Sequence, residues 1–428
     1  METLRKRLEA GTFDASLAQL YGAQAMGSAR VRVASVLDAF VDTFHALPEA
    51  VYSAPGRTEL GGNHTDHQHG CVLAAAVDLD LIAAVTPNRS GMIRVQSEGY
   101  PLVEVNLAEL APKEGEENTT AALIRGVAAR MAALGCPLQE AGAEVYVVSN
   151  VPAGSGLSSS AAFEVLMGTV LNDLFWGGSC TPVKIARVGQ YAENVYFGKP
   201  SGLMDQTASA VGGVVAIDFA DPTTPLVEQI PLNLRAAGYA LCILDSGADH
   251  ADLTQEYAAI TRELKAVCRV FGKEVLREVA EEEFFAALPA VRQAAGDRAA
   301  LRAIHVFAEN RRAVEEAEAL RRGDFEAFLS LVRESGRSSA MYLQNLVPAG
   351  QATHQELPMS IALCEKILAG RGAVRVHGGG FGGTVQAFVP LELLDTFQLQ
   401  TEAVLGKGSC RVVTVRPVGG ICLQRIEK

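Results

Sequence analysis

A glycine- and serine-rich turn between a predicted strand and a predicted helix constrains this chain more than any other segment. The turn reads Pro152-Ala153-Gly154-Ser155-Gly156-Leu157-Ser158-Ser159-Ser160-Ala161. An apolar run over residues 143–151 predicts a buried strand before it, and apolar residues at helical spacing over 162–175 follow it. The two glycines allow a phosphate to approach the backbone, and the N–H groups at the start of a helix attract anions. The segment therefore predicts either a phosphate-binding loop or a serine-capped turn.

The loop differs from a Walker A motif, because no lysine follows its second glycine. Two further glycine-rich segments accompany it. One covers residues 53–67 and reads Ser-Ala-Pro-Gly-Arg-Thr-Glu-Leu-Gly-Gly-Asn-His-Thr-Asp-His. The other covers residues 375–383 and reads Arg-Val-His-Gly-Gly-Gly-Phe-Gly-Gly. Each segment alone is a weak to moderate signal, whereas three in this order are a strong one.

Together the three segments resemble the motifs of the GHMP small-molecule kinases. The first is similar to the galactokinase signature, Gly-Arg-x-Asn-Leu-Ile-Gly-Glu-His-Thr-Asp-Tyr. The resemblance implies an α+β fold of two domains with the active site between them. The N-terminal domain would have the ribosomal-protein-S5-like domain 2 fold, and the C-terminal domain would be a ferredoxin-like α/β plait with added helices. We place the boundary near Gly212 and Gly213, which predicts domains of residues 1–212 and 213–428. Residues 1–48 are a helical lead-in of unassigned role.

Composition and charge exclude several classes of protein. The 428 residues suffice for two separate cores, and a net charge of −12 without a basic stripe argues against nucleic-acid binding. The N-terminal residues lack the apolar core of a signal peptide, and no apolar run is long enough to cross a bilayer. Eight scattered cysteines without a C-x-x-C pair fit reduced thiols. We expect a cytoplasmic protein, monomeric or weakly homo-oligomeric, with no membrane or nucleic-acid partner.

The resemblance implies an ATP-dependent kinase that phosphorylates the C1 hydroxyl of galactose, with Mg²⁺ as the cation. The predicted ATP-binding residues are those of the central loop: Gly154, Ser155, Gly156, Leu157, Ser158, Ser159, Ser160 and Ala161. Ser160 and Glu193 match the hydroxyl and carboxylate that bind the cation in the family, and Mg²⁺ prefers oxygen ligands. Without the resemblance, Glu193 would be interpreted as a solvent-facing glutamate on a helix.

Two residues match the catalytic positions of the family. Asp205 stands in Ser-Gly-Leu-Met-Asp-Gln (residues 201–206), similar to the family's Cys-Gly-Ile-Met-Asp-Gln, and it corresponds to the catalytic carboxylate. Arg57 corresponds to the catalytic arginine. An arginine beside a carboxylate lowers the pKa of the acid and keeps it ready to accept a proton. We predict that Asp205 is the general base; the sequence leaves open whether it takes the whole proton or orients the hydroxyl.

Five residues match positions that contact the sugar: Asn63, His64, Asp66, Gly202 and Tyr257. Fixed donors and acceptors recognise hydroxyl groups because a buried polar group left unpaired penalises the wrong epimer. The run His-Thr-Asp-His-Gln-His at residues 64–69 also permits a metal cluster, although no H-E-x-x-H motif or second ligand cluster accompanies it. The sugar-binding interpretation is the stronger of the two.

Three residues depart from the galactokinase pattern: Asn63 replaces glutamate, His67 replaces tyrosine and His377 replaces threonine. An asparagine keeps an acceptor but loses the negative charge. Galacturonate or N-acetylgalactosamine is therefore an alternative substrate, and plant galacturonate kinases look similar here, with Ala-His-Ile-Asp-His-Gln. A non-catalytic galactose and ATP sensor is an alternative of another class. The intact Ser-Ser-Ala at residues 159–161 favours catalysis.

Overall fold

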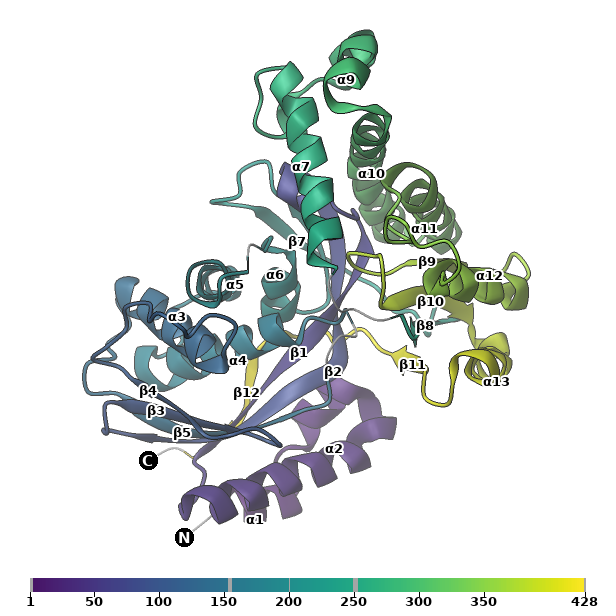
Figure 1. The fold of residues 1–428 in the computed structure, drawn as a ribbon. Coiled ribbons are helices and arrows are strands. Elements are labelled where there is room, and N and C mark those ends of the chain that lie inside the picture. Colours follow the sequence, from purple (N-terminus) through teal and green to yellow (C-terminus); the bar gives the residue numbers. More distant parts are fainter. Residues whose placement is uncertain (1–2, 153–155, 200, 249–252, 427–428) are drawn as a thin grey trace.

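The computed structural model describes residues 3–152, 156–199, 201–248 and 253–426, and it contains two β-sheets with helices on their faces (Figure 1). Gly154 and Ser155 of the predicted phosphate loop lie outside the described residues. The α+β class predicted from the sequence is confirmed.

The larger sheet has eight strands in the order β12-β1-β2-β5-β3-β4, with β6 paired to β2 and β7 paired to β6. β3 and β5 are parallel, and the other pairs are antiparallel. Its strands are β1 (Ala50–Gly61), β2 (Cys71–Asn88), β3 (Met92–Ser97), β4 (Val103–Asn106), β5 (Gly142–Ser149), β6 (Val214–Asp218), β7 (Leu226–Ile230) and β12 (Ile421–Arg425). Every residue of β1 is buried, as expected for a strand covered on both faces.

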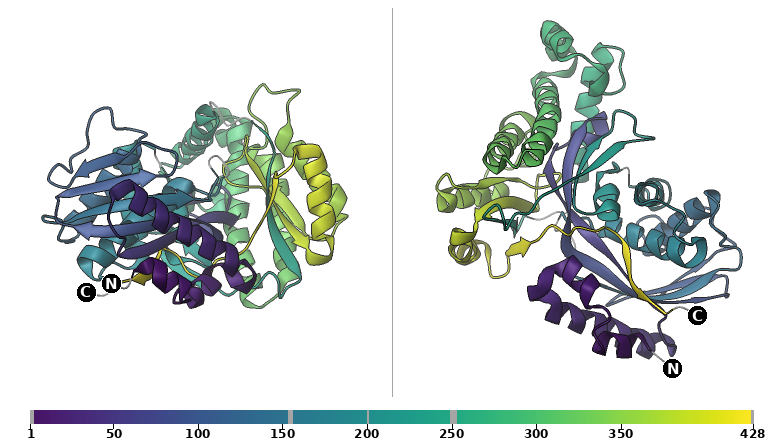
Figure 2. Two further views of the ribbon diagram at one scale, coloured as in Figure 1. Left: turned by 90° about the horizontal axis from the view of Figure 1, so that it is seen from below. Right: turned by 180° about the vertical axis from the view of Figure 1, so that it is seen from behind.

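Helices cover both faces of this sheet (Figure 2). One face carries α3 (Thr120–Ala133), α4 (Ser159–Trp176), α5 (Pro182–Tyr191) and α6 (Met204–Val211). The other carries α1 (Leu4–Glu9) and α2 (Asp14–Phe44), which pack on β1, β2 and β12. The helical lead-in predicted for residues 1–48 thus buries an apolar face against the sheet. This burial gives the segment a structural role.

The second sheet has four antiparallel strands in the order β11-β8-β10-β9. They are β8 (Tyr239–Asp245), β9 (Ala373–Val376), β10 (Thr384–Pro390) and β11 (Cys410–Val413). Helices α12 (Glu356–Leu368) and α13 (Leu394–Leu405) share one core with this sheet, and α11 (Phe325–Ser338) packs Phe328 against Phe388, with 5.3 Å between ring centroids. Helices α7 (Thr254–Val270), α8 (Glu281–Ala286), α9 (Leu288–Ala295) and α10 (Asp297–Arg321) surround a separate core.

The sequence analysis did not identify β7 or β12, the two short strands that complete the larger sheet. Helix α5 continues into a π-helical turn, Ala192–Phe197, which carries Glu193. The predicted boundary at residues 212 and 213 does not separate the sheets, because β6, β7 and β12 all join the larger one.

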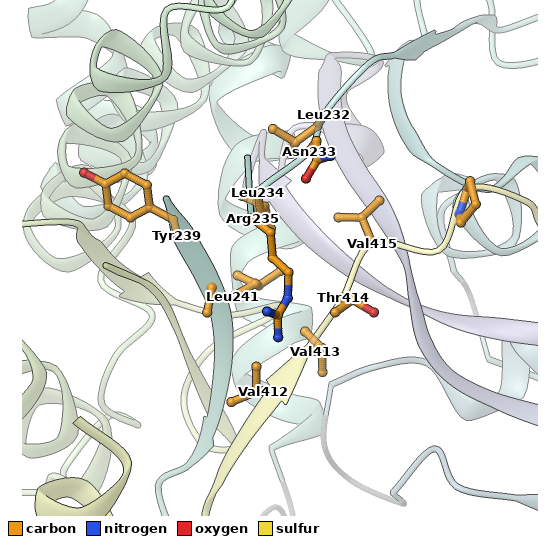
Figure 3. Close-up of a pocket in the computed structure, with 12 residues that line it drawn as sticks. Leu232, Asn233, Leu234, Arg235, Tyr239, Leu241, Val412, Val413, Thr414 and Val415 are labelled. Atoms are coloured by element: carbon orange, nitrogen blue, oxygen red, sulfur yellow. The ribbon is translucent and has the colours of Figure 1, made fainter. Parts of the chain in front are cut away.

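A pocket of about 280 Å³ lies where the two sheets adjoin, between β8, β11 and residues 232–235 (Figure 3). Its lining is largely apolar, with the side chain of Arg235 beside Leu241 and Val413. None of the predicted site residues lines this pocket, so the predicted active site lies in another part of the molecule. Within the part of the chain that the structure describes, no helix is long and apolar enough to cross a membrane. All eight cysteines are free, as expected.

Candidate active site

The centre of the site is an ion pair between two residues that the sequence predicted to act together. Arg57 lies in β1 and Asp205 in the first turn of α6. The guanidinium Nε and Nη2 each donate to one carboxylate oxygen of Asp205 at 2.7 Å. Burial alone would raise the pKa of Asp205, but Arg57 and a hydrogen bond from Ser158 hold it below its ordinary value. The carboxylate is therefore ionised at neutral pH and able to accept a proton.

The described part of the phosphate loop lies directly against this ion pair. The Nη1 of Arg57 donates to the carbonyl of Gly156, and the Arg57 backbone N–H donates to the carbonyl of Leu157 at 3.0 Å. Ser158 is the N-cap of α4 with a left-handed φ of 58°. The N–H groups of the following turn have no partner within the helix, because the first turn of any helix leaves them free. The loop thus presents an anion-binding helix end beside Arg57.

The two predicted cation ligands also meet. Ser160 Oγ lies 3.0 Å from Glu193 Oε1. Lys199 Nζ is 2.8 Å from the same oxygen, and Glu193 Oε2 accepts hydrogen bonds from Ser201 Oγ at 2.6 Å and Gln206 Nε2 at 2.9 Å. Glu193 is 2% exposed, which shows that the solvent-facing interpretation of this residue is wrong.

Asp66 and Gly202 are neighbours at the edge of the ion pair. A Cβ atom built on Gly202 would lie 2.0 Å from Asp66 Oδ2, so a larger residue at this position would displace the Asp66 carboxylate. The other oxygen, Oδ1, accepts a hydrogen bond from the backbone N–H of His67 at 2.9 Å. The predicted sugar-binding loop therefore packs on the segment that leads into Asp205.

Carbonyl groups of the third glycine-rich segment accept hydrogen bonds from two side chains that the sequence predicted to contact the sugar. His64 Nε2 donates to the Gly379 carbonyl at 3.0 Å, and the Tyr257 hydroxyl donates to the Gly380 carbonyl at 3.0 Å. Burial, with a smaller contribution from His67, lowers the pKa of His64 to about 3. His64 is consequently a neutral imidazole with its proton on Nε2.

The Asn63 side chain is fully buried and bonded within the protein. Its Nδ2 donates to Glu59 Oε1 at 3.0 Å and to the Gly378 carbonyl at 2.7 Å. Its Oδ1 accepts from Asn345 Nδ2 at 3.0 Å and from Ser339 Oγ at 3.3 Å. All four hydrogen-bonding positions of the amide are used, so Asn63 ties β1 to the third segment.

His377, the residue of the third segment that departs from the galactokinase pattern, bridges two hydroxyl groups. Its ring nitrogens lie 2.9 Å from Thr58 Oγ1 and 2.8 Å from Thr384 Oγ1. Burial and then the nearby guanidinium of Arg57 lower the pKa of His377 to about 3. The neutral imidazole links β1 to β10 next to Gly156.

Sequence reasoning missed the buried charges of α10 that support this site. Glu309 accepts hydrogen bonds from the backbone N–H groups of Gly62 and Asn63, both at 3.2 Å, and His305 Nε2 donates to the Asn63 carbonyl at 3.0 Å. Burial would raise the pKa of Glu309, but His305 and nearby arginines lower it to about 2. Glu309 and His305 of this charged helix are therefore buried and bonded to the sugar-binding loop instead of facing solvent. Charged residues usually face water, so the sequence did not indicate this burial. The spacing of residues along a helix does not show that a distant segment of the chain covers them.

Comparisons with known proteins agree with this fold. Residues 122–213 match the family model of the GHMP kinase N-terminal domain, and residues 38–87 match the galactokinase galactose-binding signature. The structure is similar to that of Lactococcus lactis galactokinase complexed with galactose, with a TM-score of 0.76 and 26% identity over 91% of this chain and 99% of that one. L. major mevalonate kinase shares the fold, with a TM-score of 0.59 and 15% identity over 87% and 97%. The fold and the site define a GHMP kinase.

A relative narrows this class further. Streptomyces coelicolor galactokinase is 33% identical over 393 residues, which cover 90% of this chain and 97% of that protein. The chain belongs to the galactokinase family, a family of ATP-dependent sugar kinases.

Proposed function

We propose that this protein transfers the γ-phosphoryl group of ATP to the C1 hydroxyl of galactose, giving galactose 1-phosphate and ADP. The observation that carries the proposal is the Arg57–Asp205 ion pair at the point where the phosphate loop and the galactose-binding signature adjoin. A sugar kinase must hold a phosphate chain and a hydroxyl group together in the correct geometry. The galactose-bound relative and the Streptomyces coelicolor galactokinase support galactose as the acceptor.

In this mechanism Asp205 accepts the proton of the C1 hydroxyl as its oxygen attacks the γ-phosphorus. The bond between the γ-phosphorus and the bridging oxygen breaks, and ADP leaves with that electron pair. Arg57 keeps Asp205 ionised and offsets negative charge on the transferring group, because its Nη1 already points to the phosphate loop. The N–H groups at the start of α4 hold the phosphates of ATP.

We propose that Ser160 and Glu193 hold Mg²⁺ together with the nucleotide. A hydroxyl and a carboxylate oxygen 3.0 Å apart are hard donors of the kind that this cation prefers. Bound Mg²⁺ would neutralise phosphate charge at this position. No group of three or more His, Cys, Asp or Glu side chains able to hold a metal exists among the described residues, including residues 64–69. The remaining ligands would be phosphate oxygens and water, as is usual for Mg²⁺.

For the sugar, we propose that His64, Asp66, Tyr257 and the Gly202 N–H contact the hydroxyl groups, and that Asn63 positions the loop. The galacturonate alternative was motivated by Asn63 and His67, and its physical reason was an Asn63 side chain that faces the sugar. Because the whole Asn63 amide is bonded within the protein, the argument from Asn63 for a uronate substrate no longer holds. The free cysteines agree with a cytoplasmic location, which we also propose.

A coupled assay of ADP release tests the proposal on a panel of galactose, glucose, galacturonate and N-acetylgalactosamine. We expect the highest kcat/KM for galactose, with phosphate on the C1 oxygen by ³¹P NMR. A higher kcat/KM for galacturonate or N-acetylgalactosamine would identify that sugar, and not galactose, as the preferred substrate. Binding of galactose and ATP by calorimetry without any turnover would instead indicate a sensor.

A further inference from the structure

Lys199 places a positive charge against the carboxylate that we assign to the cation. It follows the π-helical turn that contains Glu193, and its ammonium lies 2.8 Å from Glu193 Oε1. The Lys199 side chain is 55% exposed, whereas that of Glu193 is 2% exposed. The lysine therefore reaches inward from the surface, and it has room to leave.

The two oxygens of Glu193 are not equivalent. Oε2 is held by Ser201 and Gln206, the latter completely buried. Oε1 is the oxygen that Ser160 contacts, and Lys199 contacts this same oxygen. A cation held jointly by Ser160 and Glu193 must use Oε1, at a ligand distance of roughly 2.0–2.1 Å. Two cations on one oxygen repel each other, so the ammonium and the cation compete for this position.

We propose that Lys199 exchanges partners during nucleotide binding: it neutralises Glu193 when the site holds no nucleotide, and it moves to the phosphates when the metal-nucleotide complex takes Glu193. This inference rests on the proposed function, because it assigns Glu193 to the cation. A lysine suits the exchange, since it carries a compact charge on a flexible stem and binds phosphate as a point charge.

The exchange couples the metal to the nucleotide. Free Mg²⁺ must displace Lys199 without offering it a new partner, whereas the metal-nucleotide complex supplies phosphate oxygens to the displaced ammonium. Lys199 therefore weakens binding of the free cation and strengthens binding of the complex. A residue that merely held Glu193 in place would support both binding events.

The opposite directions make the proposal testable with Lys199→Met. Binding of Mn²⁺ in the absence of nucleotide is measured by electron paramagnetic resonance, and binding of the magnesium complex of AMPPNP by calorimetry. We expect Lys199→Met to bind Mn²⁺ about fivefold more tightly and the complex about fivefold more weakly, as suits a partly exposed charge pair. Lys199→Arg keeps the charge and should resemble the wild type in both measurements. Lys184→Met removes an exposed charge from α5 and is the matched control.

Tighter Mn²⁺ binding together with weaker binding of the complex in Lys199→Met alone supports the exchange. Weaker or unchanged Mn²⁺ binding would overturn it, as would unchanged binding of the complex. Neither measurement uses galactose turnover. If Lys199→Met shows both affinity shifts but the wild-type protein does not phosphorylate galactose, the proposed function is refuted and the exchange stands. If the wild-type protein is active but Lys199→Met shows neither shift, the exchange is refuted and the proposed function stands.

Discussion

Arg57 and Asp205 form a two-point ion pair, with both N···O distances at 2.7 Å, although 148 positions separate them in the chain. A fork-shaped guanidinium fixes the orientation of a carboxylate as well as its charge. Asp205 is thereby held in place before any substrate arrives, and such preorganisation lowers the cost of reaching the transition state.

Replacement of Asp205 by asparagine should remove most of kcat and leave nucleotide affinity intact. The amide keeps the shape of the side chain but cannot accept the sugar proton, and a general base contributes about 10²–10⁴-fold to rate. Initial rates of ADP release and calorimetry with AMPPNP measure the two quantities. A variant with nearly normal kcat would refute the assignment of Asp205 as the base.

An alanine at position 202 should raise the KM for galactose by at least about tenfold, because a shift of the order of 1 Å in positioning groups weakens productive binding strongly. Its Cβ would lie 2.0 Å from Asp66 Oδ2 and would displace that carboxylate. Affinity for the nucleotide should remain unchanged. Gly27→Ala is the matched control, since a Cβ there meets nothing within 4 Å. Equal KM values for the two variants would remove Asp66 from the sugar site.

Loss of the buried Arg375 guanidinium should destabilise the protein severely. Arg375 is fully buried, donates to Glu59 and also to the Leu60 carbonyl at 2.8 Å. Arg375→Met leaves the Glu59 carboxylate without its ion-pair partner, which costs about 3–5 kcal/mol for a buried pair. Urea unfolding measures the change. The double variant Glu59→Gln, Arg375→Met should recover part of the loss, and simple additivity of the two single changes would contradict this coupling.

The pH dependence of unfolding should reveal His377. Its pKa is about 3 in the folded protein against an ordinary value of 6.5, because the buried ring resists protonation. Below pH 6.5 the unfolded chain therefore binds a proton that the folded chain does not, and stability falls as the pH decreases toward 3. His377→Gln should reduce the slope of unfolding free energy against pH by about 1.4 kcal/mol per unit in this range. The exposed His354→Gln is the control, and equal slopes for both variants would contradict the buried neutral ring.

The sequence predicted the meeting of the three glycine-rich segments, because their order and residue types resemble a known family. It also predicted correctly that Ser160 and Glu193 lie next to each other, although their roles stay predictions. It did not reveal that Glu309 and His305 bind the backbone of the sugar loop, because a charged helix face has the same local pattern whether water or a distant loop covers it. Nor did it identify β12, since the partner of a short strand is set by tertiary contacts.

The position of β12 affects how the protein is made. This strand comes from the last described residues of the chain, yet it borders β1, which carries Arg57. During synthesis the edge of β1 at residues 50–53 stays unpaired until residues 421–425 have been made. An unpaired strand edge is a template for association with other chains. The emerging polypeptide thus passes through a period in which the strand that carries Arg57 has an open edge, and the pairing of β12 ends this period.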